Sequence, residues 1–315
     1  MNALERFDRV SLGVFPTPVQ KLSNISRHLG VNVYVKRDDM TGLGLGGNKV
    51  RKLEFLMAQA KAQGAQVVFT TGGAQSNHAM LTAAAARKMG MTPILILKAR
   101  GVMARQGNQL LEHLMGVDVR FMDTDSYADI DREMDRVGVQ LGVPYYKIPC
   151  GGSNALGTLG YVDCVREIRE QGLRFDHIVC AEGSGGTMAG LSLGAKLFMP
   201  DARIHGMMVD SDPFEEITVR LMREAAALLD ADVQISGADF ALRDMCGPGY
   251  AIPSEEGNAA VAMMAQEEGL FLDPVYTGKA FAGLIAMARE GAFAPDARVL
   301  FLHSGGAGGL FALGE

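Results

Sequence analysis

The sequence has no tryptophan, and only 7% of its residues are aromatic. It has no apolar run close to the roughly 20 residues that a membrane-spanning helix needs. Its first residues, "MNALERFDRVSLG", are charged and lack the apolar region of a signal peptide. The net charge of −6 gives no electrostatic basis for binding nucleic acid or an anionic membrane. We therefore expect a cytoplasmic protein.

Cysteine is scarce and scattered. The chain has four cysteines, with no CxxC pair and no cluster of cysteine and histidine. They are Cys150, Cys164, Cys180 and Cys246. This spacing is typical of reduced, mostly buried thiols in a cytosolic protein, and it predicts no metal site.

Apolar residues, by contrast, make up 48% of the 315 positions, enough for a large core. Short apolar runs alternate with helical patterns, which predicts an α/β fold with parallel-rich sheets covered by helices on both faces. The expected strands cover 31–38, 66–72, 92–99, 118–123, 145–149, 176–183, 203–210 and 297–306. The expected helices cover 48–63, 76–89, 104–115, 128–141, 157–171, 186–197, 212–229, 255–268 and 278–290.

Length suggests two domains, but no linker divides the chain in two, so the pattern allows one domain to be inserted in another. In folds of this type, ligands bind beyond the carboxyl ends of the strands, where loops lead into helices. Four such places contain residues that could carry chemistry.

The first place is "GLGLGGNKVRKLEFLMAQA", 42–60, where glycines lead to Asn48, Lys49 and a helical pattern. Asn48 stands at the N-cap position of the expected helix. The partial positive charge of a helix start should lower the pKa of Lys49. A neutral lysine amine can form a Schiff base with a carbonyl group. An exposed lysine with no such role is the common alternative.

The second place is "TTGGAQSNHAMLTAAAA", 70–86, where Ser76 and Asn77 open a helix after a glycine turn. Backbone N–H groups at a helix start can bind an anion such as a carboxylate. Simple helix capping is the alternative, because serine and asparagine are preferred capping residues.

The third place is "CAEGSGGTMAGLSLG", 180–194. Its residues Gly183, Ser184, Gly185, Gly186 and Thr187 lead into a helix, an arrangement that can bind a phosphate through backbone N–H groups. No GK[ST] follows, and Met188 replaces the third glycine of a dinucleotide fingerprint. The phosphate therefore need not belong to a nucleotide, and a glycine turn without a ligand is the alternative.

The fourth place lies near the C-terminus, where Tyr276 precedes a helix, Ser304 ends a strand, and Tyr250 lies in a loop rich in glycine and proline. Each could instead be a core or capping residue, and His78 and His303 are more typical of structural histidines. Together, a lysine of lowered pKa, a phosphate loop and an anion-binding helix start meet the requirements of pyridoxal 5'-phosphate (PLP) chemistry.

The sequence also resembles a known family. Its motifs "GGNKVRKLEFL", "QSNH", "IPCGGSNALGTLGYV", "GSGGTMAGL" and "LDPVYTGKAFAGLI" are similar to those of PLP-dependent enzymes of the tryptophan-synthase-β group (fold type II). Within this group it resembles the family of D-cysteine desulfhydrase, L-cysteate sulfo-lyase and 1-aminocyclopropane-1-carboxylate (ACC) deaminase. The resemblance runs from "FPTPVQKL" to "HSGGAGGLFAL". It implies a large PLP-binding domain of 1–51 plus 157–315, a small inserted α/β domain of 52–156, and a homodimer.

The resemblance also implies roles for the residues already named. Lys49 would be the Schiff-base lysine, Asn77 would bind the cofactor's ring hydroxyl, and Ser304 would contact its ring nitrogen. The loop from Gly183 to Thr187 would hold the phosphate. Ser76, with the backbone of Asn77 and His78, would bind the substrate carboxylate. Tyr250 and Tyr276 match a pair of tyrosines that face the substrate, and the catalytic set would be Lys49, Ser76, Tyr250 and Tyr276.

Two positions distinguish the members of this family. ACC deaminases have glutamate after the tyrosine and leucine in "HLGG", whereas this chain has Thr277 and Ser304, close to the "DPVYTGK" and "HTGG" of desulfhydrases. Met80 and Leu81 replace an arginine and a glutamine that usually follow "QSNH", which predicts poor use of cysteate.

We therefore expect a lyase that performs α,β-elimination on a small amino acid, D-cysteine before others. ACC deamination and L-cysteate cleavage are the alternatives within the family. A PLP or small-molecule binder without catalysis is an alternative of another class. A NAD-dependent dehydrogenase fits less well, because neither glycine loop matches the dinucleotide pattern.

Overall fold

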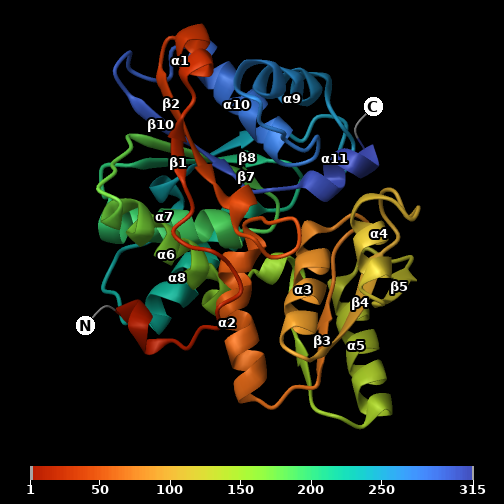
Figure 1. Cartoon of the computed structure of the whole chain (residues 1–315). Coiled ribbons are helices and arrows are strands. Elements are labelled where there is room, and N and C mark those ends of the chain that lie inside the picture. Colours follow the sequence, from red (N-terminus) through yellow and green to blue (C-terminus); the bar gives the residue numbers. More distant parts are fainter. Residues whose placement is uncertain (1–2, 314–315) are drawn as a thin grey trace.

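The computed structural model describes residues 3–313, and two sheets organise them (Figure 1). The larger sheet has six strands in the order β1-β2-β10-β7-β8-β9. They are β1 (Val19–Lys21), β2 (Asn32–Arg37), β7 (His177–Glu182), β8 (Arg203–Met208), β9 (Ala241–Asp244) and β10 (Arg298–His303). Only the β1–β2 pair is antiparallel, so the described part of the sheet is parallel-rich as predicted.

The smaller sheet has four parallel strands in the order β5-β4-β3-β6. They are β3 (Val67–Thr70), β4 (Thr92–Lys98), β5 (Asp118–Met122) and β6 (Tyr145–Lys147). The chain enters this sheet after β2 and leaves it before β7. We propose the division into 1–51 plus 157–315 and 52–156 on that basis, although residues 1, 2, 314 and 315 lie outside the described part.

Eleven α-helices occur among the described residues. The first six are α1 (Ser23–Leu29), α2 (Lys49–Ala62), α3 (Asn77–Lys88), α4 (Gly107–Leu114), α5 (Tyr127–Leu141) and α6 (Ala155–Glu170). The others are α7 (Gly186–Phe198), α8 (Phe214–Leu228), α9 (Glu255–Glu268), α10 (Thr277–Arg289) and α11 (Ala307–Leu313). Short 3-10 turns cover Ala3–Arg6, Asp38–Met40, Cys150–Gly152 and Gly237–Asp239. None of the described helices is long and apolar enough to cross a membrane.

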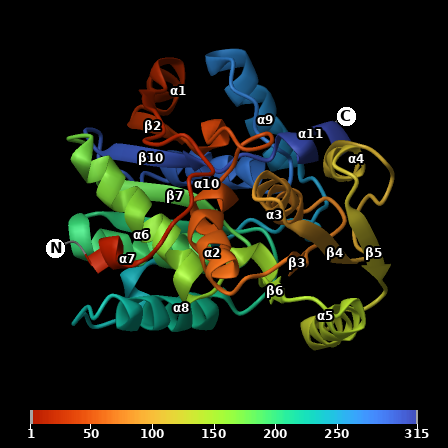
Figure 2. The same cartoon turned by 60° about the horizontal axis from the view of Figure 1, so that its bottom comes forward.

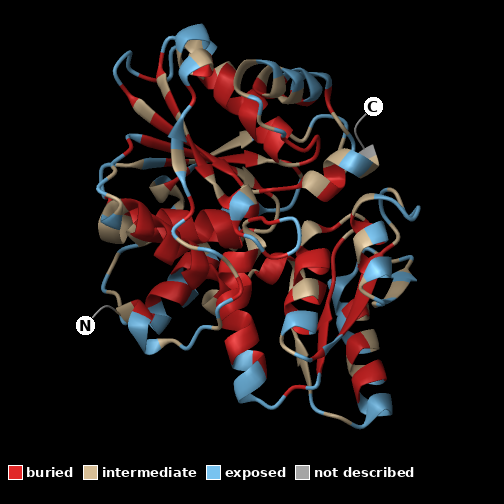
Figure 3. Ribbon diagram, in the orientation of Figure 1, coloured by how far each residue is buried: buried red, intermediate tan, exposed pale blue. Residues whose placement is uncertain are grey.

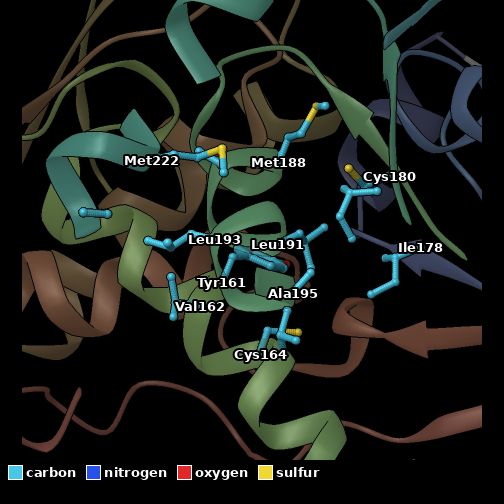
Figure 4. Close-up of a cluster of buried hydrophobic side chains, with 14 of the residues drawn as sticks. Tyr161, Val162, Cys164, Ile178, Cys180, Met188, Leu191, Leu193, Ala195 and Met222 are labelled. Atoms are coloured by element: carbon cyan, nitrogen blue, oxygen red, sulfur yellow. The ribbon is translucent and has the colours of Figure 1, made fainter. Parts of the chain in front are cut away.

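Alternating residues of the central strands fill two cores on opposite faces of the larger sheet. Ile178 and Cys180 of β7 pack with α6, α7 and α8, in the cluster shown in Figure 4. Val179, which points to the other face, packs with α1, α9 and α10. Both faces are therefore covered, and this explains why parallel strands of this kind are apolar at nearly every position.

The smaller sheet is built in the same way. Phe69 of β3 and Ile96 of β4 face α5, whereas Leu95 of β4 faces α3. Figure 3 shows buried residues through both sheets and along α2, with exposed residues on the outer surfaces of the helices. In Figures 1 and 2, α2 runs between α6 and α3, so it joins the two sheets.

The sequence predicted every long element of the described fold to within a few residues, and the α/β fold class is confirmed. It missed β1, α1, β9 and α11. These are short segments of three to seven residues, and β1 and β9 have no fully buried residue, so they give little periodic signal.

Candidate active site

A cavity of about 330 Å³ lies between the two sheets, where the carboxyl ends of several strands meet. Its walls come from loops that follow β3, β6, β7 and β10 and from the starts of α2 and α3. The predicted residues that line it are Lys49, Ser76, Asn77, His78, Gly183, Ser184, Thr187, Tyr250, Tyr276 and Ser304. Tertiary structure therefore brings together residues from six separate stretches of the sequence.

Lys49 is the first residue of α2, and its amine makes no hydrogen bond or ion pair with any described residue. Burial lowers its pKa, and Cys150 and Glu182 oppose part of this shift. The lowered pKa agrees with the prediction, but its main cause is desolvation rather than the helix start. Asn48 occupies the N-cap position without making a capping bond; its side chain donates to Thr187 Oγ1 at 3.0 Å instead.

A second amine lies close to Lys49 and was not predicted. Lys52 is fully buried one turn along α2, and its Nζ donates to Gly151 O at 3.1 Å and to Ser153 Oγ at 3.3 Å. Burial lowers its pKa well below the ordinary value, and the Lys49 amine lowers it further. The signal in the sequence was the spacing of three residues, which places both lysines on one side of a helix.

The glycine loop after β7 divides into two parts. Gly183, Ser184 and Thr187 line the cavity, whereas Gly185 and Gly186 are not among the lining residues. A Cβ on Gly186 would lie 2.7 Å from Ser153 Oγ and 2.8 Å from Lys52 Nζ. Gly185 has a φ of +81°, and a Cβ there would lie 2.5 Å from Ile217. Glycine is thus required at 186 by the neighbouring polar groups and at 185 by the turn itself.

The start of α3 combines capping with free backbone donors. Ser76 Oγ accepts a hydrogen bond from Ala79 N at 3.2 Å, so Ser76 is the N-cap. The backbone N–H groups of Asn77 and His78 make no hydrogen bond with described residues. The capping explanation therefore holds for Ser76, and two N–H groups stay available, while anion binding by them stays a prediction.

Two contacts fix the orientation of the neighbouring side chains. Asn77 Oδ1 accepts from Asn108 Nδ2 at 2.8 Å, which leaves the Asn77 amide with its Nδ2 donor available. The His78 ring is buried, and its Nε2 lies 2.8 Å from Thr70 Oγ1. Burial lowers the pKa of His78 well below its ordinary value, so its imidazole is a neutral structural group.

Tyr250 and Tyr276 form a pair. Their hydroxyl oxygens lie 2.6 Å apart, and burial raises the pKa of Tyr250 to about 12 and that of Tyr276 well above its usual value. Asp273 accepts hydrogen bonds from the backbone N–H groups of Tyr276 and Thr277, which fixes the start of α10. Both tyrosines are therefore protonated at neutral pH and can donate a proton to a group in the cavity.

The two positions that distinguish the family members play different parts. Ser304 lines the cavity, and its carbonyl oxygen accepts from Asn48 N at 3.0 Å, which ties the end of β10 to the start of α2. Thr277 is fully buried, and its hydroxyl donates to Asp273 Oδ1 at 2.6 Å. Ser304 can meet a ligand directly, whereas Thr277 acts through Asp273.

Met80 and Leu81 lie outside the cavity lining. Both are buried in the core beside α2, where their side chains pack under Gly44. They cannot act on a substrate by direct contact, so the argument against cysteate based on them has no structural support.

The mouth of the cavity contains residues that the sequence analysis did not select. Lys98 is buried, donates to Asp125 O at 2.8 Å, and lies over the Tyr127 ring at 3.5 Å. Arg100 pairs with Asp125 at 2.6 Å, and Tyr127 Oη donates to Cys150 Sγ at 3.3 Å. These residues come from three segments, so no local pattern could have identified them. No cluster of potential metal ligands occurs in residues 3–313.

Comparisons with known proteins show the family of the chain. Residues 10–305 match the family described as "Pyridoxal-phosphate dependent enzyme". A D-cysteine desulfhydrase from Klebsiella pneumoniae is 41% identical over 323 residues, with 99% of this chain and 98% of that protein covered. A protein from Pyrococcus horikoshii, described as a candidate ACC deaminase, is 43% identical over 320 residues, with 99% and 96% covered.

Solved structures share the fold. The crystal structure of an ACC deaminase homologue superposes with a TM-score of 0.92 at 42% identity, covering 98% of this chain and 95% of that one. A PLP-dependent aspartate racemase superposes with a TM-score of 0.71 at 14% identity, covering 96% and 94%. The second likeness shows the shared fold alone.

Proposed function

Because the chain belongs to the family of pyridoxal-phosphate dependent enzymes, we propose that it is a carbon–sulfur lyase acting on D-cysteine. The overall reaction would convert D-cysteine and water into pyruvate, ammonia and hydrogen sulfide. The observation that carries this proposal is the Lys49 amine, unpaired and of lowered pKa, in one cavity with the tyrosine pair.

The residues present fit PLP. Ser184 and Thr187 bring hydroxyl groups to the cavity, and the buried Lys52 amine lies beside Gly186 of the same loop. A phosphate needs such a set of donors with a cation nearby. Lys49 is the neighbouring amine that a carbonyl group would meet.

We assign the other contacts from the same geometry. The Gly183–Thr187 loop would hold the phosphate, Asn77 the ring hydroxyl and Ser304 the ring nitrogen, while Lys49 would hold the aldehyde carbon. Bound PLP supplies an electron sink for negative charge that develops at the α-carbon of an amino acid.

The chain's own groups would perform the proton transfers. The N–H groups of Asn77 and His78, with the Ser76 hydroxyl, would bind the substrate carboxylate and orient its α-proton. Lys49, whose pKa is lowered by desolvation, would remove that proton in its neutral form. Tyr250 or Tyr276, protonated at neutral pH, would donate a proton to the departing sulfur.

The direct test is a substrate panel of D-cysteine, L-cysteine, β-chloro-D-alanine, L-cysteate and ACC. Pyruvate with sulfide from D-cysteine, and no 2-oxobutyrate from ACC, supports the proposal. Efficient 2-oxobutyrate formation from ACC overturns it in favour of ACC deamination. Absence of any product from a protein that retains PLP favours a binder without catalysis.

ACC deamination is the second candidate, because several relatives carry that name. Ser304 in the cavity wall argues against it, since a hydroxyl beside the ring nitrogen does not supply the negative charge that keeps this nitrogen protonated. A less electron-withdrawing ring suits elimination of a good leaving group better than ring opening.

We further propose that the protein is a cytoplasmic homodimer, as the resemblance implies. Sedimentation equilibrium on the full chain tests the assembly: a mass of twice 33.6 kDa supports a dimer, and a mass of 33.6 kDa contradicts it. Cell fractionation tests the location.

A further inference from the structure

The phosphate loop contains an acidic side chain that no step of the proposed reaction uses. Glu182 is the last residue of β7, its side chain is 1% exposed, and it lines the cavity. Its Oε1 accepts the backbone N–H groups of Ser184, at 3.0 Å, and of Gly185. The carboxylate therefore occupies two of the donors of the loop that would hold a phosphate.

The second carboxylate oxygen strengthens this observation. Glu182 Oε2 is buried and has no hydrogen-bond partner among the described residues. A buried carboxylate oxygen without a partner is costly, so its presence needs an explanation. The charged or titratable groups that act on Glu182 are Lys49 and Lys52 of α2 and Cys180 of β7, and none forms an ion pair with it.

A phosphate at this loop would place a dianion beside the carboxylate. Two anions that share a buried site cannot both keep full charge, so one of them takes up a proton or moves away. Burial already favours the neutral form of Glu182, because it raises the pKa of this carboxyl group despite the two N–H groups and the nearby lysines.

We propose that Glu182 is an internal anion of the phosphate loop, which competes with the cofactor phosphate and becomes protonated when that phosphate binds. The inference rests on the proposed PLP site. It makes cofactor binding in this chain dependent on pH: raising the pH charges Glu182 and weakens phosphate binding. In the absence of phosphate, the same carboxylate holds the loop in shape through Ser184 and Gly185.

The test uses the full chain freed of PLP, with Glu182→Gln as the variant. Glutamine keeps an oxygen that can accept the two N–H groups but cannot carry the charge. The matched control is Glu170→Gln, which removes a carboxylate of the exposed Arg166–Glu170 pair. Calorimetric titration with inorganic phosphate at pH 8.5, in two buffers of different ionisation enthalpy, gives both the affinity and the number of protons taken up.

We expect Glu182→Gln to bind inorganic phosphate about tenfold more tightly than the unmodified chain, as loss of one nearby charge repulsion would allow. It should also take up fewer protons, while Glu170→Gln should match the unmodified chain in both quantities. An unchanged affinity, or an unchanged proton count, overturns the proposal and leaves Glu182 as a turn-forming residue.

A second measurement separates this inference from the assignment of the site. PLP and pyridoxal, which lacks the phosphate, are titrated into both proteins. Glu182→Gln should bind PLP more tightly than the unmodified chain does, and it should bind pyridoxal with unchanged affinity. If the variant binds PLP and pyridoxal more tightly to the same degree, Glu182 does not act on the phosphate, and the proposal is overturned. Reduction with borohydride and peptide mapping tests Lys49 independently, so a label elsewhere contradicts the site rather than the role of Glu182.

Discussion

Helix α2 begins with cationic side chains that have opposite surroundings: Arg51 is buried, whereas Lys49 is half-buried and lines the cavity. Arg51 donates to Asp38, Glu167 and Thr17 through all of its guanidinium nitrogens. Lys49, two residues earlier, has no hydrogen-bonding or ion-pair partner among the described residues. The start of α2 therefore carries a guanidinium group inside an ionic network and, two residues away, an amine without a partner.

The ionic network beneath α2 is balanced in charge. Lys36 also pairs with Glu167, and Tyr161 Oη donates to Asp38 at 2.5 Å. The two cations thus face two carboxylates, and together they join α2 to β2 and α6. Lys49, which lines the cavity, and the buried Lys52 beside it have no carboxylate within ion-pair distance among the described residues. Paired charges such as Arg51 hold the structure, whereas these unpaired amines have lowered pKa values.

Removing the unpaired amine should have the largest effect on activity. Lys49→Ala is expected to lower kcat by at least about 10³-fold, within the range for a lost catalytic base. The melting temperature should change little, because the amine has no partner to lose. Steady-state assays with D-cysteine and thermal unfolding measure both quantities. The control is Lys61→Ala, an exposed lysine of the same helix, and equal losses in both variants would contradict the role of Lys49.

Breaking the ionic network around Arg51 should have the opposite result, with its main effect on stability. Arg51→Met leaves Asp38 and Glu167 without their main partner, so we expect a loss of about 3–5 kcal/mol in the free energy of unfolding. Urea titration measures it. Arg220→Met breaks the exposed Arg220–Glu224 pair and should cost no more than about 1 kcal/mol. A loss at Arg51 as small as the one at Arg220 would show that the network does not support the fold.

A third change adds bulk beside Lys52. Gly186→Ala places a Cβ within 3 Å of Ser153 Oγ and Lys52 Nζ, so PLP should bind about tenfold more weakly. Gly190→Ala, in the same helix, crowds Tyr161 instead and should lower stability without changing PLP affinity. Fluorescence titration with PLP compares the two, and unchanged affinity in Gly186→Ala would place the phosphate elsewhere.

The smallest expected effect comes from Glu112, a buried acid that forms no ion pair with any residue in 3–313. Among the described residues, the Glu112 side chain accepts a hydrogen bond only from Gln109 Nε2, at 2.8 Å, and burial raises its pKa to about 8. The folded state therefore binds a proton that the unfolded state releases above about pH 4.5. The resulting stability is complete below pH 4.5 and is lost as the pH rises toward 8. Glu112→Gln should remove this loss, making the variant more stable than the parent at pH 9 by about 1 kcal/mol or more. If the free energies of unfolding of the variant and the parent change with pH in parallel, this prediction is wrong.

Much of this molecule could be predicted from the sequence. The periodic apolar pattern predicted the strands and helices around both sheets, because burial on both faces leaves a regular signal. The motifs around Lys49, Ser76 and Gly183 were recognisable because glycine turns and helix starts have local sequence requirements. Asn48 shows the limit of such local arguments: its position was right, but its side chain bonds Thr187 of a distant helix.

The sequence by itself determined the fold class, the long elements and the residue types at each strand end. Only the tertiary structure decided which of these residues share a cavity and which charges are paired. Lys49, Arg51 and Lys52 look alike in the sequence, as three cations on one helix start. Their roles differ because Asp38 and Glu167 reach Arg51, Gly151 and Ser153 reach Lys52, and nothing described reaches Lys49. Those contacts join segments up to 116 residues apart, so no local pattern could encode them.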